Sequence, residues 1–253
     1  METIDYFISA AGLEPPDGET YYTERLVKLN RLPCLFEPSA EASLPPPRAA
    51  LGLPVERTLY GCPQSLFKFH PDFDQVLADI IEADPDGHII LLDGGQQHLV
   101  ALLKARWVNG YPVSLERTTF LPKLVHADFM ALLGHLDVLL DPLHFGSGHT
   151  LYEAMQHGTP IVTWPGAFMR SRIVMAAYAQ MGIDEPPVAD RIEDYAEIAV
   201  KLGRDPARRE ALRAELKAAA REKLFHDVGF VREFEAFCQE ALHALPAVNK
   251  RPV

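Results

Sequence analysis

The stretch HFGSGHTLYEAMQHGTPIVTWPG, residues 144–166, contains a loop, a helix and a strand in close succession. A loop with Gly146 and Gly148 leads into a helix predicted over 149–158, and a second turn leads into an apolar strand within 159–166. Glycines lack a Cβ, so the loop backbone can approach a ligand closely. The N–H groups and dipole of a helix start favour an anion. A capped helix without a ligand is the alternative, because a glycine pair alone is a weak signal.

The segments before and after this stretch alternate between strand and helix. A continuous apolar run at 88–94 is typical of a buried parallel strand, and the helix predicted from Pro71 has apolar residues at helical spacing. Further strands are predicted at 57–62, 117–122, 137–142 and 159–166. This alternation predicts an α/β fold, a Rossmann-like doubly wound parallel sheet. The last third is predicted to be largely helical, with a break at Asp205–Pro206.

The first 55 residues differ from the rest. A short strand is predicted within IDYFIS at 4–9 and one helix within 20–30, followed by a proline-rich linker at 36–54. We therefore expect two parts, an N-terminal segment with its linker at 1–55 and a Rossmann-like lobe with C-terminal helices at 56–253.

Composition narrows the classes of partner. The chain has 253 residues, 48% hydrophobic residues and a net charge of −11, and this charge argues against a broad nucleic-acid interface. Three dispersed cysteines without a CxxC pair favour a reducing compartment. No apolar run approaches the ~20 residues of a membrane span, so we expect a cytoplasmic protein with no membrane partner. His126, His144 and His157 lack the HxxxH or HExxH spacing, so no metal is expected.

Three loops should meet at the carboxyl end of the predicted sheet, where ligands bind in such folds. They carry Lys68, then Lys123 with His126, and then Gly148, His149 and Thr150. Lys68 is the natural counter-charge for an anion at the helix start. Surface lysines that only contact water, and histidines that only cap helices, are the ordinary alternatives. His149 has the chemistry of a general base or a phosphate donor, and Glu153 suits the hydroxyls of a ribose.

Common nucleotide and hydrolase motifs are absent. The sequence has no GxSxG motif and no GxxxxGK[ST] motif, and no GxGxxG motif follows the first strand of the predicted sheet. A nicotinamide cofactor therefore lacks its fingerprint, and no cofactor is expected.

Several motifs in the same order resemble the C-terminal, donor-binding half of SPINDLY/O-linked N-acetylglucosamine transferase-like glycosyltransferases of bacterial type. They are IDYFISA…YYTERLVKLNRLP, QSLFKFHPDF, PLHFGSGHTLYEAMQHGTPIVTWPG and FMRSRIVMAAYAQMGI. The resemblance implies a GT-B fold, in which two Rossmann-like lobes enclose the active site. It also implies an inverting, metal-independent transfer from a UDP-sugar, which the C-terminal lobe mainly binds.

The resemblance assigns roles to the residues that match its motifs. Lys68 matches the lysine that neutralises the departing diphosphate, and Ser65 stands where the animal enzymes have glutamine. LPKLVH resembles the uridine segment: Leu121 offers a backbone contact to uracil, Lys123 matches the motif lysine, and His126 matches the histidine that stacks on the base.

The same resemblance covers the helix start. Gly148, His149 and Thr150 fall where the family holds the diphosphate, with Gly148 opposite the histidine of the animal enzymes. Glu153 matches the acidic residue that binds the ribose.

Family members also carry an N-terminal lobe, and Met1 falls near the end of that lobe. It supplies acceptor contacts and the proposed base, so we expect this chain alone to be incomplete for turnover without the missing lobe or a partner chain. The expected function is sugar transfer from a UDP-sugar to a protein or peptide acceptor. A non-catalytic nucleotide-sugar binding module and an interaction domain are the alternatives.

The last predicted helix has an apolar stripe. Its members are Phe230, Phe234, Phe237 and Leu242. Such a stripe either drives self-association into a homo-oligomer or packs against its own domain.

Overall fold

The computed structural model describes residues 4–39 and 45–244. Its main body is a five-stranded sheet in the order β5-β4-β3-β6-β7, with every neighbouring pair parallel. The strands are β3 (Thr58–Cys62), β4 (Gly87–Leu92), β5 (Thr118–Leu121), β6 (Val138–Leu140) and β7 (Ile161–Val162). The predicted α/β fold with a doubly wound parallel sheet is confirmed.

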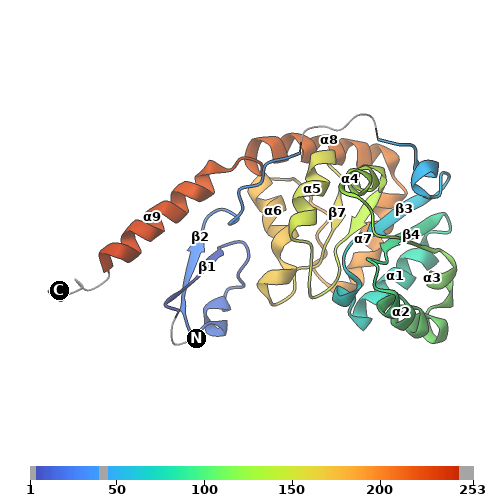
Figure 1. The fold of residues 1–253 in the computed structure, drawn as a ribbon, viewed down its shortest axis with the longest axis horizontal. Coiled ribbons are helices and arrows are strands. Elements are labelled where there is room, and N and C mark those ends of the chain that lie inside the picture. The colour runs from blue at the N-terminus through green and yellow to red at the C-terminus, as the bar shows by residue number, and fades with distance from the viewer. Residues whose placement is uncertain (1–3, 40–44, 245–253) are drawn as a thin grey trace.

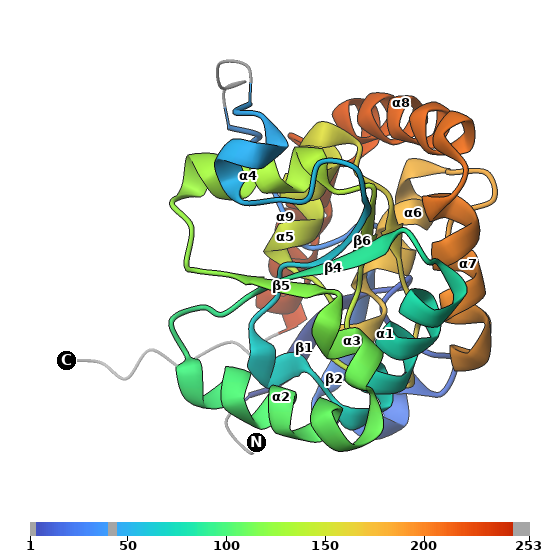
Figure 2. The ribbon, with the colours of Figure 1, turned by 90° about the vertical axis from the view of Figure 1, so that its right-hand side faces the viewer.

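Helices cover both faces of this sheet (Figure 2). The helices α1 (Pro71–Ala83), α2 (Gln97–Gly110) and α3 (Pro112–Glu116) lie on one side, and α4 (His126–His135) and α5 (His149–His157) lie on the other. The helix α7 (Tyr195–Gly203) packs against α1. The helices α6 (Ile173–Met181) and α8 (Pro206–Lys223) pack against each other, and α8 also contacts α5.

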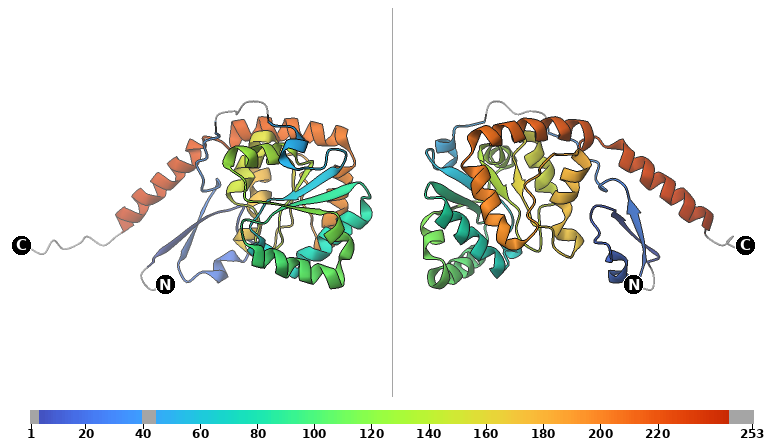
Figure 3. Two further views of the ribbon diagram at one scale, coloured as in Figure 1. Left: turned by 45° about the vertical axis from the view of Figure 1, so that its right-hand side comes forward. Right: turned by 180° about the vertical axis from the view of Figure 1, so that it is seen from behind.

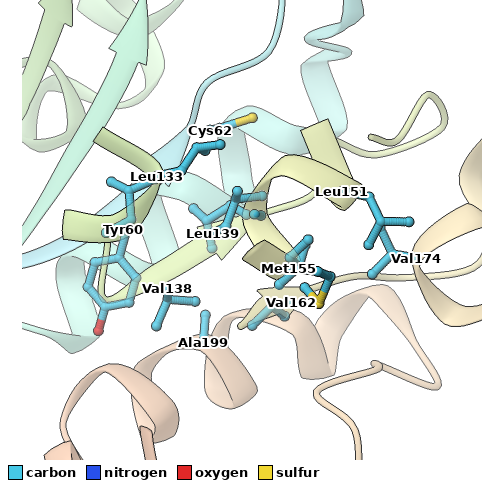
Figure 4. Close-up of a cluster of buried hydrophobic side chains, with 14 of the residues drawn as sticks. Tyr60, Cys62, Leu133, Val138, Leu139, Leu151, Met155, Val162, Val174 and Ala199 are labelled. Carbon is cyan, nitrogen blue, oxygen red and sulfur yellow. The ribbon is translucent and has the colours of Figure 1, made fainter. Parts of the chain in front are cut away.

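The core forms where the central strands meet helices of both layers (Figure 4). Tyr60 of β3 and Leu139 of β6 are fully buried together with Leu133 of α4, Met155 of α5 and Ala199 of α7. Burial of a leucine or methionine side chain such as Leu133, Leu139 or Met155 contributes about 1.5–3 kcal/mol. The centre of the sheet is therefore the rigid base from which the loops at its carboxyl end extend.

The helix start and stop signals of the sequence appear in the structure. Asp205 caps α8 through a hydrogen bond from the Arg208 N–H at 2.9 Å. Gly158 and Gly182 end α5 and α6 in the left-handed conformation, with φ of 67° and 71°. Only glycine adopts this conformation without a steric penalty.

The N-terminal segment forms a second, small sheet. Its strands β1 (Tyr6–Ala10) and β2 (Arg25–Leu29) pair in parallel, in register from Tyr6 with Arg25 to Ala10 with Leu29. The strand expected within 4–9 is confirmed, but the helix expected within 20–30 is wrong. Arg25–Leu29 contains good helix formers, and pairing with β1 overrides that local preference.

Short 3-10 turns connect these elements. They are η1 (Gly18–Tyr21), η2 (Arg48–Leu51), η3 (Leu66–Lys68), η4 (Met169–Ser171) and η5 (Ile192–Asp194).

The helix α9 (Val228–Ala244) extends away from the main body, above the small sheet (Figure 1). The two views in Figure 3 show the same arrangement from other sides. Phe237 contacts Tyr6 of β1, with ring centroids 5.2 Å apart, so part of the apolar stripe packs against its own chain. Phe234 and Leu242 of that stripe remain exposed.

None of the helices in the described ranges combines the length and the apolarity that a membrane crossing requires.

Candidate functional site

The strand order reverses between β3 and β6, and the loops that follow these two strands flank the reversal point. In doubly wound sheets the ligand crevice lies there, at the carboxyl ends of the strands. The loop after β3 continues into η3, which ends at Lys68, and the loop after β6 leads to Gly148 and α5. The topology therefore brings together two chain segments that the sequence analysis selected separately.

Lys68 connects these two loops directly. Its Nζ donates to Gln64 Oε1 at 2.8 Å and to the Gly146 carbonyl at 3.0 Å, and it lies 4.5 Å from the centroid of the Phe145 ring. Burial lowers the pKa of Lys68, while the Asp141 carboxylate and the Cys62 thiol oppose that shift. A half-buried ammonium group thus lies beside the glycine loop, as the sequence predicted.

The glycine loop is built around Asp141, a fully buried carboxylate at the end of β6. Its Oδ1 accepts from the Ser147 N–H at 2.5 Å, and its Oδ2 accepts from the Thr163 hydroxyl at 2.8 Å. A Cβ on Gly146 would lie 2.6 Å from Oδ2, so only glycine fits there. Burial raises the pKa of Asp141, and the hydrogen bonds from Ser147 and Thr163 together with Lys68 oppose that shift.

The start of α5 is open to a ligand. Gly148 caps the helix without a side-chain hydrogen bond, and a Cβ there would meet no atom within 4 Å. The first N–H groups of any α-helix lack partners within the helix, and they carry the positive end of its dipole. The N–H groups at His149 and Thr150 can therefore bind an anion that sits before the helix.

Glu153 lies one turn further along α5, between two histidines. Its Oε1 is 3.7 Å from His149 Nε2 and 3.7 Å from His126 Nδ1. The Glu153 side chain is 9% exposed, whereas those of His126 and His149 are 64% and 72% exposed. A buried carboxylate flanked by two accessible imidazoles suits a ligand that offers hydroxyls and an aromatic ring.

The other predicted residues are not joined to this cluster by side-chain contacts. Lys123 and Ser65 are exposed. Within the part of the chain that the structure describes, neither side chain makes a hydrogen bond. Leu121 is buried at the end of β5, and its carbonyl accepts from the Asp93 N–H at 2.8 Å. These three residues lie at the same end of the sheet, and their roles stay predictions.

A family model matches residues 37–233, and its description is glycosyl transferase family 41. The chain belongs to this family. The predicted relationship to O-linked N-acetylglucosamine transferase-like proteins is thereby confirmed, and structural similarity agrees with it. A mutant O-GlcNAc transferase of Thermobaculum terrenum matches 95% of this chain and 45% of its own, at 29% identity and a TM-score of 0.82.

Curated relatives in family 41 are more distant in sequence. The probable UDP-N-acetylglucosamine–peptide N-acetylglucosaminyltransferase SPINDLY of Solanum lycopersicum is 26% identical over 93% of this chain and 25% of its own length. The probable enzyme of the same description called SEC, from Arabidopsis thaliana, is 26% identical over 92% of this chain and 24% of its own. The chain therefore spans about a quarter of the length of the curated relatives it matches.

A further solved structure supports the fold alone. The sucrose-phosphate synthase of Thermosynechococcus elongatus has a TM-score of 0.60 at 17% identity, over 94% of this chain and 59% of its own. Together with the family 41 match, this places the five-stranded body among Rossmann-like lobes of GT-B glycosyltransferases.

Sequence reasoning missed two residues of this candidate site. Asp141 and Gln64 are both buried and hold the loop and Lys68 in place. Asp141 lies at the end of the strand predicted at 137–142, and Gln64 comes two residues after the strand predicted at 57–62. Their position next to the reversal point was the available signal.

Proposed function

We propose that this chain is the donor-binding lobe of an inverting, metal-independent glycosyltransferase that uses a UDP-sugar and a protein or peptide acceptor. One observation carries the proposal: the Lys68 ammonium group and the open start of α5 lie on adjoining loops, with the buried Glu153 one turn further on. Membership of family 41 and the described activities of its relatives support this choice of donor and acceptor.

In this proposal the diphosphate sits before α5. The acceptor oxygen attacks the anomeric carbon as the bond to the β-phosphate oxygen breaks, and UDP leaves with the bonding electron pair. Negative charge grows on the diphosphate in the transition state, where Lys68 and the N–H groups at Gly148, His149 and Thr150 stabilise it. Fixed donors of this kind need no reorganisation during the reaction.

The uridine occupies the opposite end of the same cluster. The Glu153 carboxylate accepts hydrogen bonds from the ribose hydroxyls, and the exposed His126 ring stacks on the base. Leu121 contributes its backbone, and Lys123 supplies a positive side chain at the rim. We assign the base that receives the acceptor proton to a second lobe, or to a partner chain that supplies it.

Calorimetric titration of the chain with UDP, with and without Mg²⁺, tests this proposal. We expect binding of similar affinity in both conditions, because Lys68 provides the positive charge that a metal ion would otherwise supply. Lys68→Ala should weaken binding about 10- to 100-fold, the range for loss of a charged hydrogen bond. Lys201→Ala on the exposed face of α7 is the matched control and should bind as the unchanged chain does.

Binding of UDP that requires Mg²⁺, or that survives Lys68→Ala unchanged, would refute this arrangement.

A second assay separates the enzyme from a binding module. A chain extended by the region that its relatives carry should transfer sugar from UDP-N-acetylglucosamine to peptide. If the extended protein binds UDP and transfers nothing, the chain is a nucleotide-sugar binding module.

A further inference from the structure

Three side chains outside the proposed donor site gather next to Lys68. His70 caps the start of α1, Asp72 lies in the first turn of that helix, and His144 lies on the loop after β6. His70 and His144 also line the shallow pocket that contains Lys68 and Arg170. None of the three has a role in the proposed binding of UDP.

Both imidazoles direct a nitrogen toward the same carboxylate oxygen. His144 Nε2 lies 2.8 Å from Asp72 Oδ2, and His70 Nδ1 lies 3.3 Å from it. The two rings meet edge to face, with centroids 4.7 Å apart. One ligand atom from each of the three residues lies within 4.8 Å of the other two.

These separations fit a single metal ion of the first transition series. Zinc bonds to imidazole nitrogen and carboxylate oxygen at about 2.0–2.2 Å, so its tetrahedral ligands lie about 3.4 Å apart. The His70–Asp72 separation already matches that value. Each of the three side chains is at least 37% exposed, so modest side-chain rotations can bring the other ligand-atom separations to about the same distance.

We propose that His70, Asp72 and His144 bind one Zn²⁺ ion, with water in the fourth position. Two imidazoles and one carboxylate form a ligand set that zinc favours and that Mg²⁺, which prefers oxygen ligands, does not. Coordination replaces the hydrogen bond between His144 and Asp72 and the cap hydrogen bond that His70 Nδ1 accepts from the Asp72 N–H. The metal takes the Nε2 lone pair of His144, and that ring stays neutral with its single proton on Nδ1. Lys68 and Arg170 line the same pocket, and their positive charges oppose a cation and lower the affinity for zinc.

The ion would connect the first turn of α1 to the loop that leads into α5. Asp72 and His144 lie 72 residues apart along the chain, so no motif of local spacing could show this set. The proposal departs from the sequence-based expectation that the protein binds no metal. It does not give the ion a part in sugar transfer, and it does not depend on the proposed function.

Calorimetric titration of the full, chelator-treated chain with zinc chloride tests the site, after removal of any polyhistidine tag. We expect one ion per chain, and an affinity that millimolar Mg²⁺ leaves unchanged. His144→Ala and His70→Ala should each weaken binding at least about tenfold, because each removes one of three protein ligands. His98→Ala, on the exposed face of α2, is the matched control and should bind zinc normally.

Substitution by Co²⁺ gives an independent readout that reports directly on the ligands. The unchanged chain should develop the visible absorption of tetrahedral cobalt at one equivalent, and His144→Ala should lose it. Thermal unfolding without metal verifies that each variant is folded, and Asp72→Asn, which preserves shape, replaces any alanine variant that is not. Absence of zinc binding by the unchanged chain, or equal binding by the folded ligand variants, would overturn the proposal.

Discussion

Asp141 organises the loop that leads into α5. It is fully buried, and both of its oxygens accept hydrogen bonds, one from the Ser147 N–H and one from the Thr163 hydroxyl. The close approach of Gly146 leaves no space for a side chain on that side. One carboxylate therefore determines the path of the backbone from β6 to Gly148.

Replacing Asp141 by alanine should lower the free energy of unfolding by about 2–4 kcal/mol, because the buried Ser147 N–H would lose its acceptor. Chemical denaturation measures this loss. Glu82→Ala on the exposed face of α1 is the control and should change stability by no more than about 0.5 kcal/mol. A loss equally small for Asp141→Ala would mean that the loop does not depend on the carboxylate.

The stability of the chain should also carry a signature of Asp141 in its pH dependence. Burial raises the pKa of Asp141 above its ordinary value of 3.8. Between the ordinary pKa of 3.8 in the unfolded state and the raised pKa in the folded state, the folded protein holds a proton that the unfolded protein has lost. Stability therefore falls as the pH rises through this window. Asp141→Asn should remove that decline while keeping an acceptor for Ser147. Denaturation of both proteins at several pH values tests this, and parallel profiles would contradict it.

The partial burial of Lys68 predicts how UDP affinity depends on pH. Because burial lowers the pKa of Lys68 below 10.5, the ammonium group loses its proton earlier than an exposed lysine does as the pH rises. UDP affinity should therefore decrease on the alkaline side before pH 10.5. Lys68→Arg, which stays charged, should flatten the profile. Titrations across the alkaline range measure it, and a profile that Lys68→Arg does not change would assign the effect to another group.

At the scale of single elements, α5 depends on the glycine that ends it. Gly158 has a φ of 67°, and a Cβ on it would lie only 2.1 Å from the Arg213 carbonyl of α8. The turn therefore allows α8 to pack closely against the end of α5. Packing of α8 against the C-terminal end of α5 thus also fixes the position of the N-terminal end, where the anion is proposed to bind.

Gly158→Ala should lower the free energy of unfolding by about 2 kcal/mol or more, because it combines a left-handed conformation with a backbone clash. Gly110→Ala is a matched control at the end of α2, where a Cβ meets nothing within 4 Å. We expect no loss there. Thermal unfolding of the two variants compares them directly, and equal midpoints would show that α8 moves aside freely.

Most elements of the main body could be predicted from the sequence because their apolar periodicity agrees with their burial. The predicted strand at 88–94 contains the continuous apolar run 89–92, and this run lies in the largely buried strand β4. The helix predicted within 20–30 is wrong because a segment as short as Arg25–Leu29 carries little periodicity, and its strand structure comes from pairing with β1.

The site was only partly predictable, for a related reason. Lys68, His149 and Glu153 follow from the rule that ligands bind after parallel strands. Asp141 acts from within the core, and its role emerges only once Ser147 and Thr163 are placed around it. Contacts between loops that are distant along the chain leave no pattern in either loop alone.

At the scale of the whole molecule, a polar network holds the small sheet to the main body. Asp227 is buried and accepts from Arg31 Nη1 at 2.9 Å and from Gln180 Nε2 at 3.0 Å. The Gln180 amide oxygen accepts from the Leu32 N–H at 2.8 Å, and Glu233 of α9 accepts from the Asn30 N–H at 2.7 Å. The end of β2, α6 and α9 are thus joined through a few side chains.

Asp227→Ala should loosen this connection without unfolding the five-stranded sheet. We expect amide hydrogen exchange in β1 and β2 to become at least about tenfold faster, while exchange in β3 and β4 stays unchanged. Glu235→Ala, which breaks only the exposed pair with Arg232, is the control. Uniformly faster exchange in both sheets would show that the two parts unfold together.

The pairing of β3 with β6 has a consequence for how the chain acquires its site. Lys68 and Gly146 lie 78 residues apart, and they meet only after the intervening polypeptide has folded and its ends have closed into the sheet. Closing so long a loop carries an entropic cost and slows formation of such contacts. A nucleotide that bridges the two loops would therefore select completed molecules over partly folded ones, and its presence should slow unfolding of the centre of the sheet.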